Sequence, residues 1–122
     1  MINGYVIGES LRAGAVFEPA GLRGRSVRRV AVAGTADGQP SVWTFVEFTF
    51  AARDAAAVAD ALAAALEPEY GWYSDFTDGD ERVVVFAGKV FRYRRGDAAG
   101  RAEAVAYGRS AGTPVDQLDW PE

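Results

Sequence analysis

Residues 71–95, with the sequence GWYSDFTDGDERVVVFAGKVFRYRR, decide the fold of this chain. Three runs rich in β-branched and aromatic residues alternate here with short segments that contain glycine. Such a pattern is typical of a three-stranded antiparallel meander. A two-residue hairpin turn at Gly88-Lys89 would place Val85 opposite Arg92, because the turn fixes which residues of its two strands face each other.

This register, with residues 77–81 as a five-residue loop, divides the side chains of the meander between two faces. One face carries the large aromatic side chains and is expected to lie beneath helices: Trp72, Phe76, Val84, Phe86, Phe91 and Tyr93. The opposite face mixes apolar and charged side chains: Tyr73, Asp75, Val83, Val85, Ala87, Val90, Arg92 and Arg94. A slip of one residue would invert the faces of a strand.

The chain outside the meander predicts three strands and two helices. The strands are expected at residues 4–8, 26–33 and 42–50, and the last of these, VWTFVEFTF, has the strongest strand composition. Apolar side chains at helical spacing predict a helix within residues 53–68, and residues 98–110 predict a second.

Aspartates stand where the helices should begin. Asp54 and Asp97 are the expected N-caps of the two helices, and Asp116 is placed to complete a capping box in a short final turn. Trp120 is expected to pack against the body of the fold. The sequence therefore predicts one α+β domain spanning residues 1–122, with an antiparallel sheet of five to six strands and two helices packed on one face.

The composition restricts the possible functions. The 122 residues include no cysteine and no histidine, which excludes thiolate chemistry and removes the commonest general base and the commonest zinc ligand. With a net charge of −4 the chain is a poor candidate for nucleic-acid binding. No stretch reaches the roughly 18 apolar residues needed to cross a membrane. We expect a cytoplasmic bacterial protein, and the sequence leaves open whether it is an enzyme.

The acidic loop after Asp75 has the wrong spacing for a metal site. A calcium-binding loop that began at Asp75 would need oxygen ligands where Thr77 and Gly79 stand. A hairpin loop exposed to solvent explains the same residues, so we expect no metal and no cofactor.

One candidate ligand site lies on the mixed face of the meander. Tyr73 and Asp75 point away from the predicted core, and Arg94 would lie two strands from Asp75, at about 10 Å. The nearby cations Lys89 and Arg92 would make this hairpin basic enough to hold an anion or an acidic partner. The alternative is a surface ion pair of little energetic value.

The second candidate site is an uncovered sheet face. If Val46, Phe48 and Phe50 belong to the core, alternation places Trp43 and Phe45 on the opposite side of their strand. There they would join Val83 and Val85 in an apolar strip, unless residues 9–25 fold across it.

Two functions follow from these sites. The first is a small non-enzymatic interaction module that forms a homodimer through the uncovered face, with Trp43, Phe45, Val83 and Val85 at the interface. The alternative is a small-molecule or protein binder, or an enzyme, whose pocket is lined by Tyr73, Asp75, Arg92 and Arg94.

Three segments carry a resemblance: GWYSDF, VVVFAGKVFRYRRGD and AEAVAYGRSAGTPVDQLDW. They resemble the second half of a family of small bacterial proteins of about 120 residues with no assigned activity. The resemblance covers about the last fifty residues well, and the first fifty only loosely through GYVIGESLRAG. It implies a single small domain and no particular site.

Overall fold

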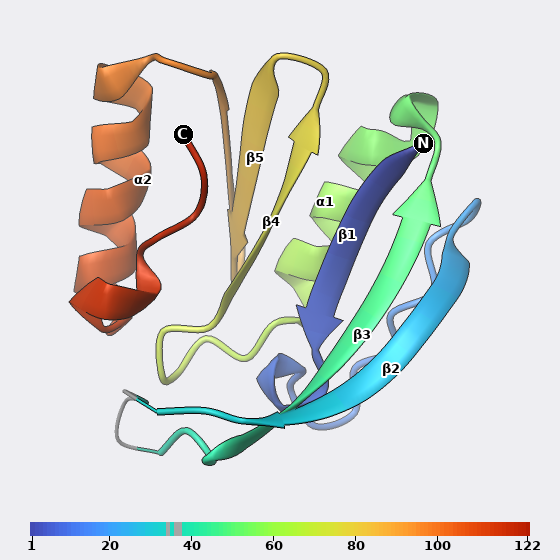
Figure 1. Ribbon diagram of the computed structural model, residues 1–122, viewed down its shortest axis with the longest axis vertical. Coiled ribbons are helices and arrows are strands. Elements are labelled where there is room, and N and C mark those ends of the chain that lie inside the picture. The colour runs from blue at the N-terminus through green and yellow to red at the C-terminus, as the bar shows by residue number, and fades with distance from the viewer. Residues whose placement is uncertain (34, 36–37) are drawn as a thin grey trace.

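The computed structural model describes residues 1–33, 35 and 38–122 and has an α+β fold, as the sequence predicts (Figure 1). The strands are β1 (Ile2–Ile7), β2 (Arg23–Ala31), β3 (Val42–Phe50), β4 (Tyr73–Asp78), β5 (Glu81–Phe86) and β6 (Lys89–Arg94). The α-helices are α1 (Ala55–Ala65) and α2 (Ala98–Ser110). Short 3₁₀ helices are found at Gly8–Ser10 (η1), Ala52–Asp54 (η2) and Val115–Gln117 (η3).

The six strands form two antiparallel sheets of three, in the orders β1-β3-β2 and β4-β5-β6, and not the single sheet that we expected. The sheets meet where β1 lies beside β4 (Figure 1). Within the described chain no strand ladder joins β1 to β4. Instead, the Ser74 hydroxyl donates to the Tyr5 carbonyl at 2.6 Å, and the rings of Phe50 and Phe76 pack edge to face at 5.2 Å. We call this boundary the seam.

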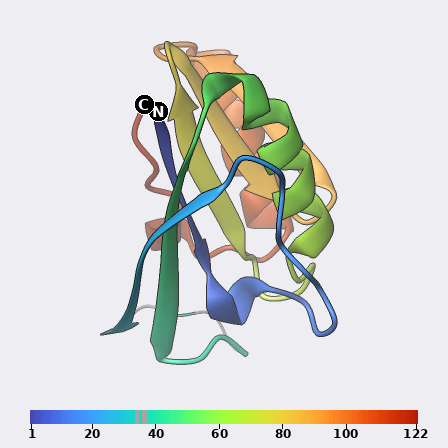
Figure 2. The ribbon, with the colours of Figure 1, turned by 90° about the vertical axis from the view of Figure 1, so that its right-hand side faces the viewer.

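The two α-helices cover opposite faces of the β4-β5-β6 sheet, so the prediction that both lie on one face is wrong (Figure 2). Helix α1 packs on the side chains of Val83 and Val85 and extends its contact across the seam to Phe48. Helix α2 packs on Val84 and Phe86, together with residues 111–122, which we call the C-terminal segment.

The predicted register of the meander is wrong by one residue at the first hairpin and by two residues at the second. The second turn is Ala87-Gly88, and Val85 pairs with Val90 and not with Arg92. Gly88 has a φ of 69° and takes the second central position of the turn, where a left-handed conformation favours glycine. The first hairpin also has a two-residue turn, since Asp78 pairs with Glu81.

The corrected register moves β4 relative to its neighbours. Tyr73 pairs with Phe86, and Asp75 pairs with Val84, so these four side chains share the face that α2 covers. Val83 and Val85 point to the other face and are 0% exposed beneath α1. The predicted exposure of these two valines is therefore wrong.

The structure confirms the predicted packing of Trp120, and it confirms the predicted helix caps only in part. The carboxylate of Asp97 accepts a hydrogen bond from the Gly100 amide at 3.0 Å, which confirms this N-cap. Asp54 and Asp116 stand at the starts of α1 and η3, but neither side chain makes a capping hydrogen bond within the described residues. Trp120 is only 3% exposed, which confirms that the C-terminal segment belongs to the core.

We call the β1-β3-β2 sheet the first sheet. The segment before β2 packs on the side of this sheet that faces α1. Leu11, Phe17 and Leu22 contact the core there, and the ring of Phe17 lies 5.5 Å from that of Phe48. Residues 9–25 therefore do not cover the opposite face of this sheet. None of the helices in the described chain is long and apolar enough to span a membrane.

Candidate functional site

A pocket of about 210 Å³ opens on the face of the first sheet that neither α1 nor α2 covers. Its walls are mainly aromatic and come from β1, β3 and the start of β4: Tyr5, Trp43, Phe45, Trp72 and Tyr73. The C-terminal segment adds two exposed carboxylates, those of Asp116 and Asp119. We call these seven residues, with the space between them, the aromatic pocket.

The strand alternation explains two of the walls. Trp43 and Phe45 are two residues apart on β3, so their side chains share the uncovered face, and Tyr5 reaches Phe45 from β1 with its ring 5.8 Å away. Trp43 packs edge to face on Trp72 at 5.1 Å, and its indole nitrogen donates to the carbonyl of Pro40 at 2.9 Å. These contacts hold the rings in place around the pocket.

A tight contact between two loops fixes the remaining wall. Gly71 has a φ of 72°, and a Cβ on this residue would lie 2.3 Å from the amide nitrogen of Thr113. Only glycine permits this approach. The Thr113 hydroxyl donates to the Gly71 carbonyl at 2.7 Å, and the Tyr73 hydroxyl donates to the Gln117 carbonyl. The side-chain carboxylates of Asp116 and Asp119 are thereby positioned against the aromatic walls.

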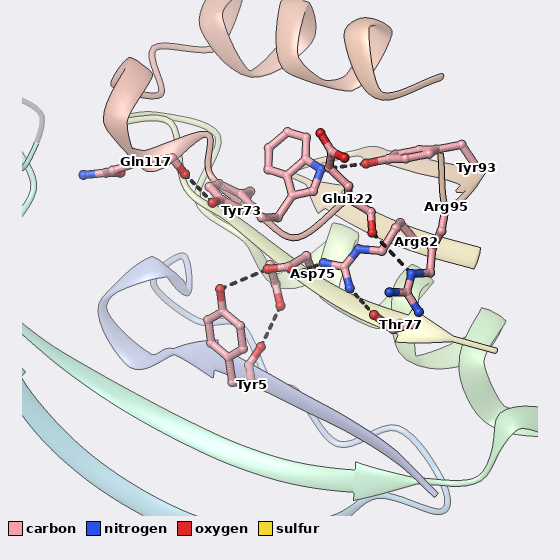
Figure 3. A network of polar contacts seen from close by, with 11 residues as sticks. Tyr5, Tyr73, Asp75, Thr77, Arg82, Tyr93, Arg95, Gln117 and Glu122 are labelled. Atoms are coloured by element: carbon pink, nitrogen blue, oxygen red, sulfur yellow. Dashed lines mark hydrogen bonds and ion pairs between the residues drawn. The ribbon is translucent and has the colours of Figure 1, made fainter. Parts of the chain in front are cut away.

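Tyr5 connects the aromatic pocket to a buried ion pair (Figure 3). Its hydroxyl donates to the Asp75 carboxylate at 3.1 Å, and the other oxygen of that carboxylate accepts from the Arg82 guanidinium at 2.5 Å. Arg82 also donates to the hydroxyl of Thr77. The side chains of Asp75 and Arg82 are 12% and 5% exposed, so water screens this pair weakly.

Burial is the main cause of the pKa shifts of Asp75, Tyr5 and Tyr73. It raises the pKa of Asp75 above the ordinary value, although Arg82 and the hydrogen bond from Tyr5 act in the opposite direction. Burial and the negative charge of Asp75 also raise the pKa of Tyr5 and of Tyr73. Both tyrosine hydroxyls therefore stay protonated at neutral pH and act as hydrogen-bond donors.

The structure does not bring together the ligand-binding residues predicted from the sequence. Tyr73 lines the aromatic pocket, and Asp75 lies behind it, but the ionic partner of Asp75 is Arg82 and not Arg94. Arg92 and Arg94 share the opposite face of the sheet, where Arg92 pairs with the carboxylates of Asp78 and Glu81. Lys89 lies at the end of the hairpin, with its ammonium 5.2 Å from the ring of Phe91.

The predicted interface residues are also divided. Trp43 and Phe45 lie on the uncovered face and line the aromatic pocket. Val83 and Val85 are buried beneath α1, on the other side of the fold.

Several residues of the site were not identified from the sequence: Tyr5, Asp116, Asp119 and Arg82. Asp116 and Asp119 are separated by Gln117 and Leu118, in a segment where acidic residues close to the chain end gave no distinctive pattern. A signal for Arg82 existed in the alternation of β5, since a two-residue first turn places it on the same face as Asp75.

The described residues contain no group of three acidic side chains arranged to hold a metal ion. Comparison of the chain with protein-family models, curated proteins and solved structures finds no match. The resemblance of the last fifty residues to a small bacterial family stays a prediction.

Proposed function

We propose that the protein is a small binding module, and that it binds its ligand or partner through the aromatic pocket. The observation that supports this is the gathering of five aromatic side chains around one cavity on a face without a covering helix. Protein interiors normally pack such side chains against one another without leaving space. At about 210 Å³ the cavity is smaller than the roughly 300–1,000 Å³ of sites for drug-sized molecules, so it suits a single side chain or a small molecule.

The chemistry of the residues favours binding over catalysis. The chain has no histidine and no cysteine, so a general base or nucleophile would have to come from another residue type. The carboxylate nearest the tyrosines, that of Asp75, is held by Tyr5 and Arg82. Tyr5 and Tyr73 keep their protons, and each already donates its one proton within the protein, to Asp75 and to the Gln117 carbonyl, so neither hydroxyl is free to act as an acid or a base on a bound group.

The three tryptophans of the chain provide a direct test. Trp43 and Trp72 line the pocket, whereas the indole of Trp120 donates to the Tyr93 hydroxyl within the core. A fragment library added to ¹⁵N-labelled protein should shift the indole NMR signals of Trp43 and Trp72 and leave that of Trp120 in place. Trp43→Ala should remove the response, and Thr49→Ala, a change farther along β3, should keep it. A library that shifts no indole signal, or that of Trp120 alone, would contradict the proposal.

A second candidate function is self-association through the same face. Trp43 and Phe45 are only partly buried, and twofold pairing is the commonest way to cover such a surface. Pairing along the free edge of β2 is less favourable, because Arg23, Arg25 and Arg28 would face like charges.

The solution mass tests this second candidate. Light scattering at rising concentration should show a dimer, which Phe45→Glu dissociates and Thr49→Glu, on the same strand and face, does not. A wild-type protein that stays monomeric at high micromolar concentration would exclude the dimer and leave the aromatic pocket as the binding surface.

A further inference from the structure

The charged residues that line the aromatic pocket have one sign. Among its described lining residues the only ionisable groups other than the two tyrosines are the carboxylates of Asp116 and Asp119. Both side chains are exposed, so they lie at the rim of the pocket. The negative charge of Asp119 contributes to raising the pKa of both Tyr5 and Tyr73, so its field reaches the aromatic walls, although the charge of Arg101 acts in the opposite direction on Tyr73.

Two arginines near these walls each contact an aromatic ring. Arg28 pairs with Glu47 at 3.3 Å and lies over the ring of Phe45, with its guanidinium carbon 4.7 Å from the ring centroid. Arg101 lies over the ring of Trp120 at 5.2 Å. Neither residue lines the pocket. Arg28 thus already contacts one pocket ring, that of Phe45, and the described residues that line the pocket supply no further cation.

The walls have the form that a cation requires. The faces of tryptophan, tyrosine and phenylalanine rings are electron-rich, and they bind alkylated ammonium and guanidinium groups within about 6 Å of the ring centroid. Rings that meet at an angle can contact one group from several sides, and Trp43 and Trp72 are inclined at 62°. An anion would be repelled by both rim carboxylates, and a neutral group would gain no charge–charge attraction from them.

We propose that the aromatic pocket binds an organic cation, such as a quaternary ammonium or guanidinium group, between its aromatic walls and the carboxylates of Asp116 and Asp119. This inference rests on the proposed function, because it names the chemistry of the ligand for the same site. The cation belongs either to a free small molecule or to a side chain of a partner protein, since both present the same chemistry.

Choline and its neutral isostere 3,3-dimethyl-1-butanol separate charge from shape. In titrations at constant ionic strength, followed through the indole signals of Trp43 and Trp72, choline should bind roughly tenfold more tightly than the alcohol. Asp116→Asn and Asp119→Asn should each weaken the binding of choline and leave that of the alcohol unchanged. Asp60→Asn is the matched control, because Asp60 is an exposed carboxylate on α1, which packs on the opposite side of the first sheet.

Two further ligands distinguish the sources of the cation. Tighter binding of N-acetyl-arginine amide than of butylguanidine, which has the same single charge, would indicate a side chain of a partner protein, and the reverse order would indicate a free molecule. Equal affinities for choline and the alcohol, or fragments that bind while all cations fail, would overturn the cation inference and leave the binding module standing. A pocket that binds neither fragments nor cations would overturn both proposals.

Discussion

Arg82→Met is expected to destabilise the protein strongly at neutral pH. The Arg82 guanidinium lies 2.5 Å from the Asp75 carboxylate, and the two side chains are only 5% and 12% exposed. Methionine keeps an unbranched apolar side chain and removes the charge, so the carboxylate is left buried without a counter-ion. Removing one partner of a buried pair lowers the free energy of unfolding by about 3–5 kcal/mol. In a domain of this size the corresponding fall in Tm is roughly 10–20 °C.

The loss should shrink as the pH falls. Because burial raises the pKa of Asp75, the folded protein keeps a proton on this carboxyl at a pH where the unfolded chain has released it. The free energy of unfolding therefore falls as the pH rises through the interval between the unfolded and folded pKa values. Arg82 lowers the pKa of Asp75, so its removal extends this interval upward. Below the interval the carboxyl is neutral in both states, and its missing counter-ion no longer matters.

Thermal unfolding followed by circular dichroism between about pH 4 and pH 8 would measure both effects. Arg92→Met is the matched control, since Arg92 also pairs with carboxylates but its side chain is 36% exposed. Such an exposed pair contributes about 0–1 kcal/mol. When Asp75→Asn is combined with Arg82→Met, the loss of stability relative to the wild type should no longer show the pH dependence that comes from Asp75. A loss for Arg82→Met that is as small as that for Arg92→Met, or that is independent of pH, would mean that Arg82 does not neutralise a buried Asp75 carboxylate.

Three other substitutions have definite expected outcomes. Val85→Glu should prevent folding, because Val85 is 0% exposed beneath α1; a native circular dichroism spectrum would contradict the register. Trp120→Ala should lower the free energy of unfolding in urea by about 3–5 kcal/mol, and an unchanged midpoint would mean that the C-terminal segment adds nothing to the core. Gly71→Ala should lower Tm more than Gly79→Ala, since both glycines have positive φ but only Gly71 lies against the backbone of Thr113; equal losses would refute the loop contact.

Local composition was sufficient to predict the elements of the fold. The segment VWTFVEFTF was predicted as a strand at 42–50 and forms β3 over those residues, because β-branched and aromatic side chains suit a half-buried sheet. Helix α2 likewise begins after its predicted cap, Asp97. These signals lie within a few neighbouring residues, so no tertiary contact is needed to recognise them.

The register could not be predicted in the same way. Gly88 fits either central position of a two-residue turn, and the two choices differ by two residues in every pair of β5 with β6, which leaves the faces unchanged. The first turn decides the face of β4, because five loop residues in place of two shift every pair of β4 with β5 by one residue. The expected five-residue loop at 77–81 placed Asp75 with arginines on an open face and left Arg82 unnoticed. In the structure Asp75 shares its face with Arg82, so its charge is neutralised inside the protein. The charged residues available to a ligand are then those of the C-terminal segment.

The aromatic pocket was harder still to predict, because its walls are brought together only by packing across the seam. Tyr5 and Tyr73 come from different sheets, and the rim carboxylates come from a third segment. Trp43 and Phe45 were recognised by alternation alone, but the sequence gives no measure of which distant segments surround them. Their true neighbours are Trp72 and the C-terminal segment.

This assembly from three segments couples ligand binding to folding. A ligand that binds only the folded state stabilises it by RT ln(1 + [L]/Kd), and here it would hold β1, β4 and the C-terminal segment together. Substitutions at the seam and at the rim should therefore act differently. Arg82→Met removes support from Asp75, which holds Tyr5, so it should weaken both the fold and the binding of a cation. Asp119→Asn changes an exposed carboxylate, so it should weaken binding and leave the melting temperature of the free protein nearly unchanged. Substitutions at different residues can thus change the stability of the fold or the affinity for the ligand. The contribution of the rim charges to binding can therefore be measured without a change in the stability of the fold.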